Sequence, residues 1–328
     1  MAGPYAVGVD VGGTKILAGV VDCGTGAVVG LSKIESLIGA AAVLDGVRDA
    51  IEQALSAAPE AARQAVTGVG LGVAGQVDRE RGVLLAAPNL GGGLSNVDFR
   101  TPLHDRFGLP VHLENDVQVA ALGEARFGAG RDVPLFACVF VGTGVGGALM
   151  MHGRRFTGAA GSAGEIGHIM VQAGGRLCGC GQHGHLEAYA SRTAIVAALR
   201  AGLAAGQPTV LEPALRDTAQ RIKSGQLLRA VQQRDRLTIR VLKQAGEYLG
   251  LGLASLINLW SPDRIVLGGG VVEKVDLLFD AAARTAKAGA LPVPAAAVEI
   301  TRTKLGDYSG VVGGAMLAHE AGAPRPGS

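Results

Sequence analysis

The stretch at residues 5–22, YAVGVDVGGTKILAGVVD, decides the fold class of this chain. It contains two apolar runs, each long enough for a β-strand, on either side of the turn GGTK. Gly-Gly between apolar strands favours a tight antiparallel hairpin, so a type I′ turn is the simplest structural explanation. The same turn can also hold phosphate, because glycine N–H groups approach phosphate oxygens, Thr14 donates a hydroxyl and Lys15 supplies positive charge.

The residues around this turn extend the phosphate hypothesis to a metal ion. Asp10 lies at the end of the first apolar run, where its carboxylate can hold Mg²⁺ through water. Gly12 and Gly13 leave the backbone open to a phosphate. The hairpin and the phosphate site are compatible, so both interpretations stay open at this point.

Outward from the hairpin, the chain alternates strand and helix patterns. An amphipathic helix is expected at 39–57 and another at 117–127, with apolar strands before each. Long helices are predicted between 186 and 260, then a strand at RIVL, and a short closing helix at 311–319. Along the chain, strand patterns are followed by helix patterns, and this order occurs twice. The repetition predicts two α/β lobes.

Composition excludes several classes of function. The 328 residues carry a net charge of +2, which gives no basic surface for nucleic acid or membrane binding. No secretion signal is visible at the start, so a cytoplasmic protein is expected. Residues 133–153 are uncharged and long enough to raise the question of a membrane span, but the segment's five glycines, four of them at 142–147, favour strand, turn and strand.

Two further glycine turns are candidates for nucleotide binding. Residues 142–147 match G-x-G-x-x-G, as do residues 70–75, but neither match precedes a helix pattern, so a dinucleotide site is disfavoured. Thr143 and Gly144 suit a second phosphate clamp. The triple glycine Gly268, Gly269 and Gly270 lies between a strand and a helix, where it is either a tight turn or a platform for a flat ring.

Four motifs together resemble the ROK family of repressors, uncharacterised frames and kinases: GVDVGGTK at 8–15, LENDVQVAALGE at 113–124, FVGTGVGGAL at 140–149, and AGEIGHI…CGCGQHGHLE at 163–187. The resemblance implies a bilobal actin-like ATPase (ribonuclease H-like) fold, in which a sugar and ATP meet in a cleft between two α/β lobes. The lobes are expected at 1–114 plus 304–328 and at 115–303, with a zinc loop at 165–187.

The resemblance also implies which residues bind the sugar and perform the reaction. Asp116 is the candidate general base, although a helix N-cap is the alternative role for Asn115 and Asp116. The positions that match the sugar pocket of the family are Asn89, Asn115, Asp116, Glu165, His168 and Glu187. A tryptophan that ROK kinases usually carry shortly after Asn89 is absent from GGGLSNVDF.

The last motif resembles the zinc loop of the family. His168, Cys178, Cys180 and His185 match its ligand positions, with His185 in place of the final cysteine, and His183 is a competing candidate. Two histidines and two cysteines form a common tetrahedral zinc set with no open position for water, so the metal would be structural. A glycine-rich loop with reduced cysteines is the alternative.

These expectations combine into an ATP- and Mg²⁺-dependent hexose 6-kinase, with glucose as the first choice of substrate. N-acetylglucosamine, N-acetylmannosamine and fructose are alternative substrates, and polyphosphate is an alternative donor. A sugar-sensing repressor is disfavoured because the first strand begins too early for a preceding DNA-binding segment, and a pseudokinase is disfavoured because Asp10, Thr14 and Asp116 are all present. A homo-oligomer is expected from the family.

Overall fold

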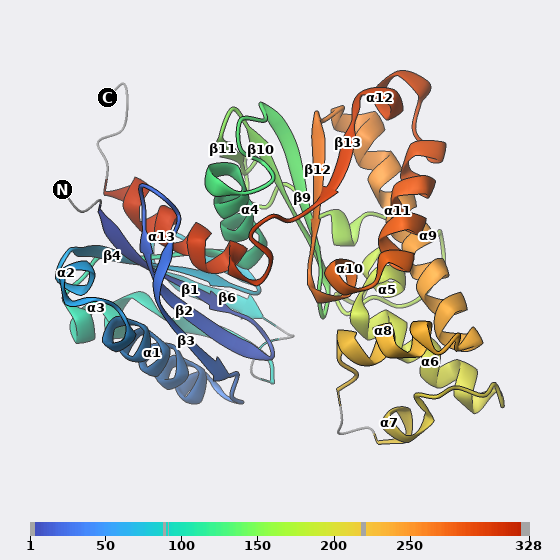
Figure 1. Cartoon of the computed structure of the whole chain (residues 1–328), viewed down its shortest axis with the longest axis horizontal. Coiled ribbons are helices and arrows are strands. Elements are labelled where there is room, and N and C mark those ends of the chain that lie inside the picture. Colours follow the sequence, from blue (N-terminus) through green and yellow to red (C-terminus); the bar gives the residue numbers. More distant parts are fainter. Residues whose placement is uncertain (1–3, 88–89, 91, 218–220, 323–328) are drawn as a thin grey trace. The chain divides into compact units, whose positions relative to one another are not determined.

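The computed structural model describes residues 4–87, 90, 92–217 and 221–322. The chain divides into two compact units (Figure 1), Met1–Val133 with Met150–Arg155 and Asp307–Ser328, and Pro134–Leu149 with Phe156–Gly306. This division differs from the expected lobe boundary at 114/115. The helix α4 (Asp116–Phe127) packs on α13 (Ser309–Ala321), and this contact groups α4 with the first unit.

The first unit is built on a five-stranded sheet in the order β3-β2-β1-β4-β8. Its strands are β1 (Tyr5–Val11), β2 (Lys15–Asp22), β3 (Val28–Glu35), β4 (Val66–Val73) and β8 (Val111–Asn115). The predicted hairpin is confirmed, since β1 and β2 pair antiparallel with Val11 opposite Ile16. The type I′ prediction is wrong, because neither Gly13 nor Thr14 has the positive φ that this turn requires.

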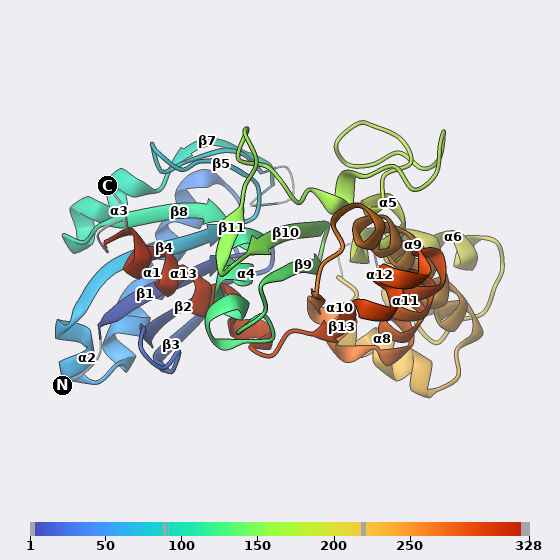
Figure 2. The same ribbon diagram turned by 90° about the horizontal axis from the view of Figure 1, so that it is seen from above.

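Helices cover both faces of this sheet. The apolar side of α1 (Ala40–Ala57) packs with Val7 and Val9 in one core, and the smaller sheet of β5 (Gln76–Asp78), β6 (Val83–Ala87) and β7 (Leu94–Asp98) adds to it. The opposite face contacts α13, which Figure 2 shows beside β1 and β4. A Cβ at Gly8 would lie 1.7 Å from the Val311 carbonyl oxygen, so only glycine allows this close approach. The remaining helices of this unit are α2 (Glu60–Gln64) and α3 (Arg100–Phe107).

The second sheet has the order β11-β10-β9-β12-β13, and its strands are β9 (Leu135–Val141), β10 (Val145–Met151), β11 (Arg154–Phe156), β12 (Arg264–Gly268) and β13 (Glu299–Arg302). The uncharged segment at 133–153 is therefore strand, turn and strand, as predicted. Among the described residues, no helix is both long and apolar enough to cross a membrane.

Helices of the second unit pack around the long helix α9 (Arg236–Trp260), which contributes Leu242, Leu249 and Leu253 to a large apolar core. A Cβ at Gly246 would lie 2.6 Å from the carbonyl oxygen of Leu278 in α11 (Asp276–Gly289), so glycine lets α11 approach α9 closely. The remaining helical segments are η1 (Ile166–His168), α5 (Glu187–Ala190), α6 (Arg192–Ala204), α7 (Glu212–Arg216), α8 (Ser224–Gln232), α10 (Gly270–Lys274), α11 (Asp276–Gly289), α12 (Pro292–Ala297) and, assigned largely to the first unit, η2 (Gly306–Tyr308).

Neither G-x-G-x-x-G match opens a helix. The match at 70–75 begins within β4 and ends just before β5, and the match at 142–147 spans the turn after β9 and the first residues of β10. The strand character that the sequence predicted after both turns is therefore confirmed, and a pyrophosphate would meet no helix N-terminus at either position.

Glu124 ties the end of α4 to the start of α13 inside the first unit. Its side chain is fully buried, accepting from the Ser309 hydroxyl at 2.7 Å and from the Ala129 N–H at 2.6 Å. A Cβ at Gly128 would lie 2.0 Å from the same carboxylate, so the chain needs glycine there. Both oxygens of a buried acid are thus satisfied by groups that meet only in the folded protein.

We expect Glu124→Ala to lower the free energy of unfolding by about 3 kcal/mol or more, because it removes the buried carboxylate that accepts from the Ser309 hydroxyl and the Ala129 N–H. Urea denaturation measures the loss. Glu320→Ala is the matched control, since Glu320 forms a half-exposed ion pair with Arg126 at 2.7 Å and should change stability by less than about 1 kcal/mol. Equal losses in the two variants would contradict this account of Glu124.

Candidate functional site

Asp10 lies on β1 against the first turn of α13. A Cβ at Gly310 would come within 2.8 Å of the Asp10 carboxyl carbon, so the acid occupies the space that a side chain would need. Burial, together with the nearby carboxylates of Asp116 and Asp307, raises the pKa of Asp10 to about 7, and the positive charge of Lys15 opposes this rise. Lys15 pairs with Asp307 at 2.8 Å. Asp10, at the end of the hairpin strand, and Asp116, at the start of α4, are therefore close enough to interact electrostatically. Two neighbouring carboxylates of this kind favour the binding of a cation.

The capping alternative for Asn115 is confirmed. Its side-chain oxygen accepts from the N–H groups of Val117 at 3.0 Å and Gln118 at 3.2 Å, and its amide donates to the Gly75 carbonyl at 3.1 Å. Asp116 is the first residue of α4, not its cap. Its carboxylate lies at the positive end of the helix dipole, which stabilises negative charge.

Glu114 is a site residue that the sequence did not indicate. It is almost fully buried, accepts from the Asn115 N–H at 2.8 Å, and forms ion pairs with Arg79 at 2.6 Å and with Arg155. Both arginines are distant in sequence and arrive from separate turns and strands. These contacts fix the end of β8, from which Asn115 and Asp116 project.

In the second unit, Glu187 connects the second glycine hairpin to the cysteine loop. Its carboxylate accepts from the Val145 N–H at 2.9 Å, and its other oxygen lies 3.7 Å from the Cys178 sulfur. A Cβ at Gly144 would lie 2.2 Å from the same carboxylate, so a side chain there would displace Glu187. Burial raises the pKa of Glu165, as does Glu187, and His168 lowers it. Glu165, His168 and Glu187 thus share one electrostatic environment.

The triple glycine forms a tight turn from β12 into α10, as predicted. Gly269 has a φ of 94°, and a Cβ there would lie 2.3 Å from the Val141 carbonyl oxygen. Gly268 ends β12, and Gly270 begins α10, a helix of only five residues. Packing of the turn explains why glycine is present. Binding of a flat ring against this turn remains a prediction.

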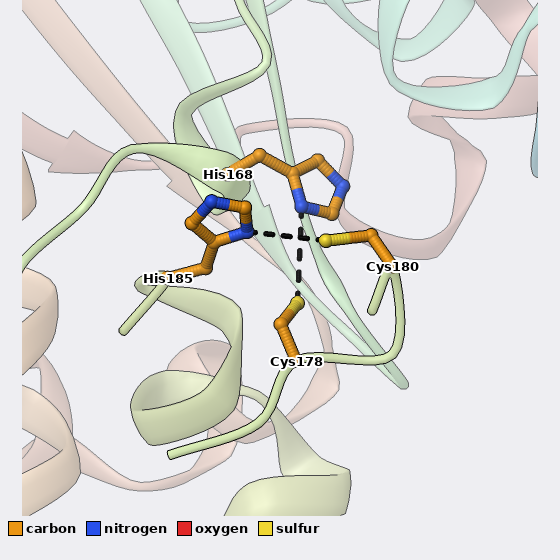
Figure 3. A group of neighbouring side chains, drawn as sticks. All are labelled: His168, Cys178, Cys180 and His185. Atoms are coloured by element: carbon orange, nitrogen blue, oxygen red, sulfur yellow. Dashed lines mark hydrogen bonds between the residues drawn. The ribbon is translucent and has the colours of Figure 1, made fainter. Parts of the chain in front are cut away.

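The four predicted metal ligands come together in the second unit. Figure 3 shows His168, Cys178, Cys180 and His185 turned toward one point, and one potential ligand atom of each lies within 4.8 Å of the others. Cys180 Sγ lies 3.2 Å from His185 Nδ1, and Cys178 Sγ lies 3.8 Å from His168 Nδ1. His183 instead contacts the Gly175 carbonyl through Nδ1 at 2.9 Å, so the structure favours His185 over His183.

This donor set fits zinc. Bonds of about 2.0–2.3 Å to a tetrahedral ion would place sulfur and nitrogen ligands close to the separations seen here. All four cysteines of the chain are free thiols, and burial raises the pKa of Cys178 to about 11. A metal that binds this thiolate must displace its proton, so metal affinity should increase with pH.

The predicted site residues are divided between the two units. Asp10, the 12–15 turn, Asn115 and Asp116 lie in the first, and Thr143, Gly144, the 268–270 turn, Glu165, Glu187 and the metal cluster lie in the second. Asn89 lies outside the described residues. In each unit, a glycine turn suited to phosphate therefore accompanies polar side chains suited to a sugar.

A family model described as ROK family matches residues 6–321, almost the whole chain. The chain belongs to the ROK family. A glucokinase of Streptomyces coelicolor is 34% identical over 324 residues, covering 96% of this chain and 97% of that protein. A xylose repressor of Caldicellulosiruptor bescii is 31% identical over 221 residues, which are 67% of this chain and 54% of the repressor.

Solved structures extend this relationship to the fold. The ROK family glucokinase of Streptomyces griseus, crystallised with glucose and AMPPNP, superposes with a TM-score of 0.83 at 32% identity, covering 96% of this chain and 99% of that one. The α/β fold class and the actin-like ATPase fold that the motifs implied are thereby confirmed.

The raised pKa of Asp10 predicts a pH-dependent stability. Between about pH 4 and pH 7 the unfolded chain has lost this proton while the folded protein keeps it, so folding is favoured at the lower pH and the advantage disappears as pH rises through about 7. Without magnesium and nucleotide, the melting temperature of the wild type relative to that of Asp10→Asn should therefore fall from pH 5 to pH 8. A constant difference between the two proteins across this range would refute the assignment.

Proposed function

We propose that this ROK protein is an ATP-dependent kinase that transfers the γ-phosphoryl group to the 6-hydroxyl of a hexose, with glucose as the preferred substrate. The observation that carries the proposal is Asp116, placed at the start of α4 and within electrostatic reach of Asp10 beside the first glycine hairpin. The glucokinase relatives, similar along nearly their full lengths, support this choice of reaction and substrate.

On the donor side, two turns would hold the phosphates of ATP. Thr14 and Lys15 follow the half-buried turn residues Gly12 and Gly13, and Thr143 with Gly144 would form the second clamp. Asp10 would hold Mg²⁺ through water, and the cation would offset both the burial of the carboxylate and its repulsion by Asp116 and Asp307, which raise its pKa. The glycine turn Gly268, Gly269 and Gly270 would carry the adenosine.

On the acceptor side, polar groups of fixed orientation would bind the sugar hydroxyls. Glu165, His168 and Glu187 are held near one another, and Glu187 is fixed by the Val145 N–H. The side-chain oxygen of Asn115 is already used in capping, so its remaining amide hydrogen is the group it can offer to a hydroxyl.

Asp116 would accept the proton of the attacking hydroxyl. Phosphoryl transfer has a loose transition state in which most catalysis is positioning and charge neutralisation, so the base needs only modest proton affinity. Glu114, with Arg79 and Arg155, fixes the strand end before Asp116, which keeps the carboxylate in one position. The proton moves to Asp116 as the new oxygen–phosphorus bond forms.

The four-residue cluster would hold zinc in a structural role. His168 has Nδ1 in the cluster, which leaves Nε2 for a sugar hydroxyl. A carboxylate oxygen of Glu187 lies 3.7 Å from the Cys178 sulfur, so the same loop also fixes a second residue proposed to bind the sugar. Zinc bound there would order two groups of the sugar site without contacting the reacting atoms.

The proposal is tested by measuring ADP release over a panel of sugars: glucose, mannose, fructose, N-acetylglucosamine and N-acetylmannosamine. We expect the highest kcat/KM with glucose, and mass spectrometry with partial hydrolysis or NMR should place the phosphate on the 6-oxygen. Preference for an amino sugar would correct the substrate but retain the reaction. ATP consumption that no sugar stimulates would contradict the proposed function.

A further inference from the structure

Arg192 lies beside the second phosphate hairpin and has no role in the function proposed above. It is the first residue of α6, and its N–H donates to the Gly142 carbonyl at 3.0 Å. The next residue fixes the same turn, since the Thr193 hydroxyl donates to the Thr143 carbonyl at 2.8 Å. The Arg192 guanidinium (Nη2) lies 3.5 Å from the Thr143 hydroxyl. This cation is therefore held next to a side chain that is suited to phosphate.

The positive charge of Arg192 is not balanced by an acid in the described part of the chain. Its side chain is half-buried, and none of the ion pairs found among the residues placed by the structure includes it. Burial lowers the pKa of Arg192, and the neighbouring cation Arg221 lowers it further. A partly buried cation near a like charge is unfavourable unless an anion joins it. The site is therefore suited to an anionic ligand.

We propose that Arg192 binds the phosphate chain of the donor beside Thr143. The inference rests on the proposed function, which assigns Thr143 to the donor phosphates. A guanidinium matches phosphate oxygens with two parallel N–H bonds, and the N-terminus of the thirteen-residue helix α6 adds partial positive charge at the same place. The ligand chemistry is a linear phosphate chain, which either ATP or inorganic polyphosphate can supply.

A purely structural role for this guanidinium is a poor explanation of the contacts. The backbone N–H of Arg192 and the hydroxyl of Thr193 already hold residues 142 and 143, and neither bond involves the guanidinium. Replacing the Arg192 side chain should leave both bonds intact. The hairpin should then keep its position, and the loss should fall on the phosphate-bearing ligand.

The test compares Arg192→Ala with Arg200→Ala, a matched control on the same helix whose guanidinium donates to the Leu215 carbonyl at 3.2 Å. Calorimetry measures the binding of ADP and of adenosine, which lacks phosphate. We expect Arg192→Ala to weaken ADP binding about tenfold to a hundredfold, the range for a lost charge-assisted bond, and to leave adenosine binding unchanged. Arg192→Lys should be intermediate, because lysine keeps the charge but not the planar fork.

A second experiment, with tripolyphosphate as the inorganic polyphosphate, distinguishes ATP from polyphosphate as the source of the phosphate chain. If the wild type uses polyphosphate as donor, Arg192→Ala should raise the KM for polyphosphate as well as for ATP; if not, only the KM for ATP should rise. Unchanged ADP binding, an equal loss for adenosine, or the same loss in Arg200→Ala would overturn the proposal. Because ADP binding needs no turnover, a wild type that phosphorylates no sugar would refute the proposed function and leave this test intact.

Discussion

Asp116→Asn should lower kcat by about a hundredfold or more, the range expected when a general base is removed. The asparagine keeps the size and position of the side chain at the start of α4 but cannot accept the hydroxyl proton. Sugar binding, measured by calorimetry, should stay within about threefold of the wild type, since positioning groups are unchanged. The measurement is the rate of sugar-dependent ADP release at saturating substrates.

Asp307→Asn is the control for this variant. Asp307, like Asp116, raises the pKa of Asp10, but its side chain is 71% exposed and pairs with Lys15. If Asp116 acted only through the charge of Asp10, the two substitutions would have similar effects. We expect Asp307→Asn to change kcat only a few-fold. Near-full activity of Asp116→Asn would remove Asp116 from the chemistry.

Loss of the metal should be the second large effect. Treatment with a strong zinc chelator should lower the melting temperature and weaken sugar binding about tenfold or more, because the loop that carries His168 and leads to Glu187 loses its anchor. Nucleotide binding should change much less. Atomic absorption measures the zinc content, and calorimetry with glucose measures the affinity.

Two histidine variants make this prediction specific to the cluster. His185→Ala should reduce the zinc content and reproduce the effects of the chelator, whereas His183→Ala, on the same loop but with its ring on the Gly175 carbonyl, should retain zinc. Equal zinc content in both variants and the wild type would show that His185 is not a ligand. Zinc loss without any change in sugar affinity would separate the metal from the sugar site.

The sequence predicted those parts of the molecule whose signals are local. The hairpin at GGTK, the helices near 40–57 and 116–127, and the turn at 268–270 follow from apolar periodicity and glycine positions within a few residues. The metal cluster was also predicted, because His168, Cys178, Cys180 and His185 match the ligand positions of the family's zinc loop. The turn type at Gly13 was not, since backbone angles there depend on the tertiary surroundings.

Long-range contacts account for what the sequence could not provide. Glu114 meets Arg79 and Arg155 only after folding, and Lys15 pairs with Asp307 from the other end of the chain. Whether Asn115 or Asp116 caps α4 depends on the residue at which the helix begins. Apolar periodicity locates that residue only to within a few positions. Arg192 carries no motif of its own, and its proximity to Thr143 is visible only in three dimensions.

A crystal structure with glucose and a non-hydrolysable ATP analogue tests the central claim most directly. The account predicts that an Asp116 carboxylate oxygen lies about 2.6–3.2 Å from the 6-hydroxyl oxygen, with that hydroxyl directed at the terminal phosphate. A bound sugar whose 6-hydroxyl hydrogen-bonds to another group, with Asp116 facing solvent, would contradict it.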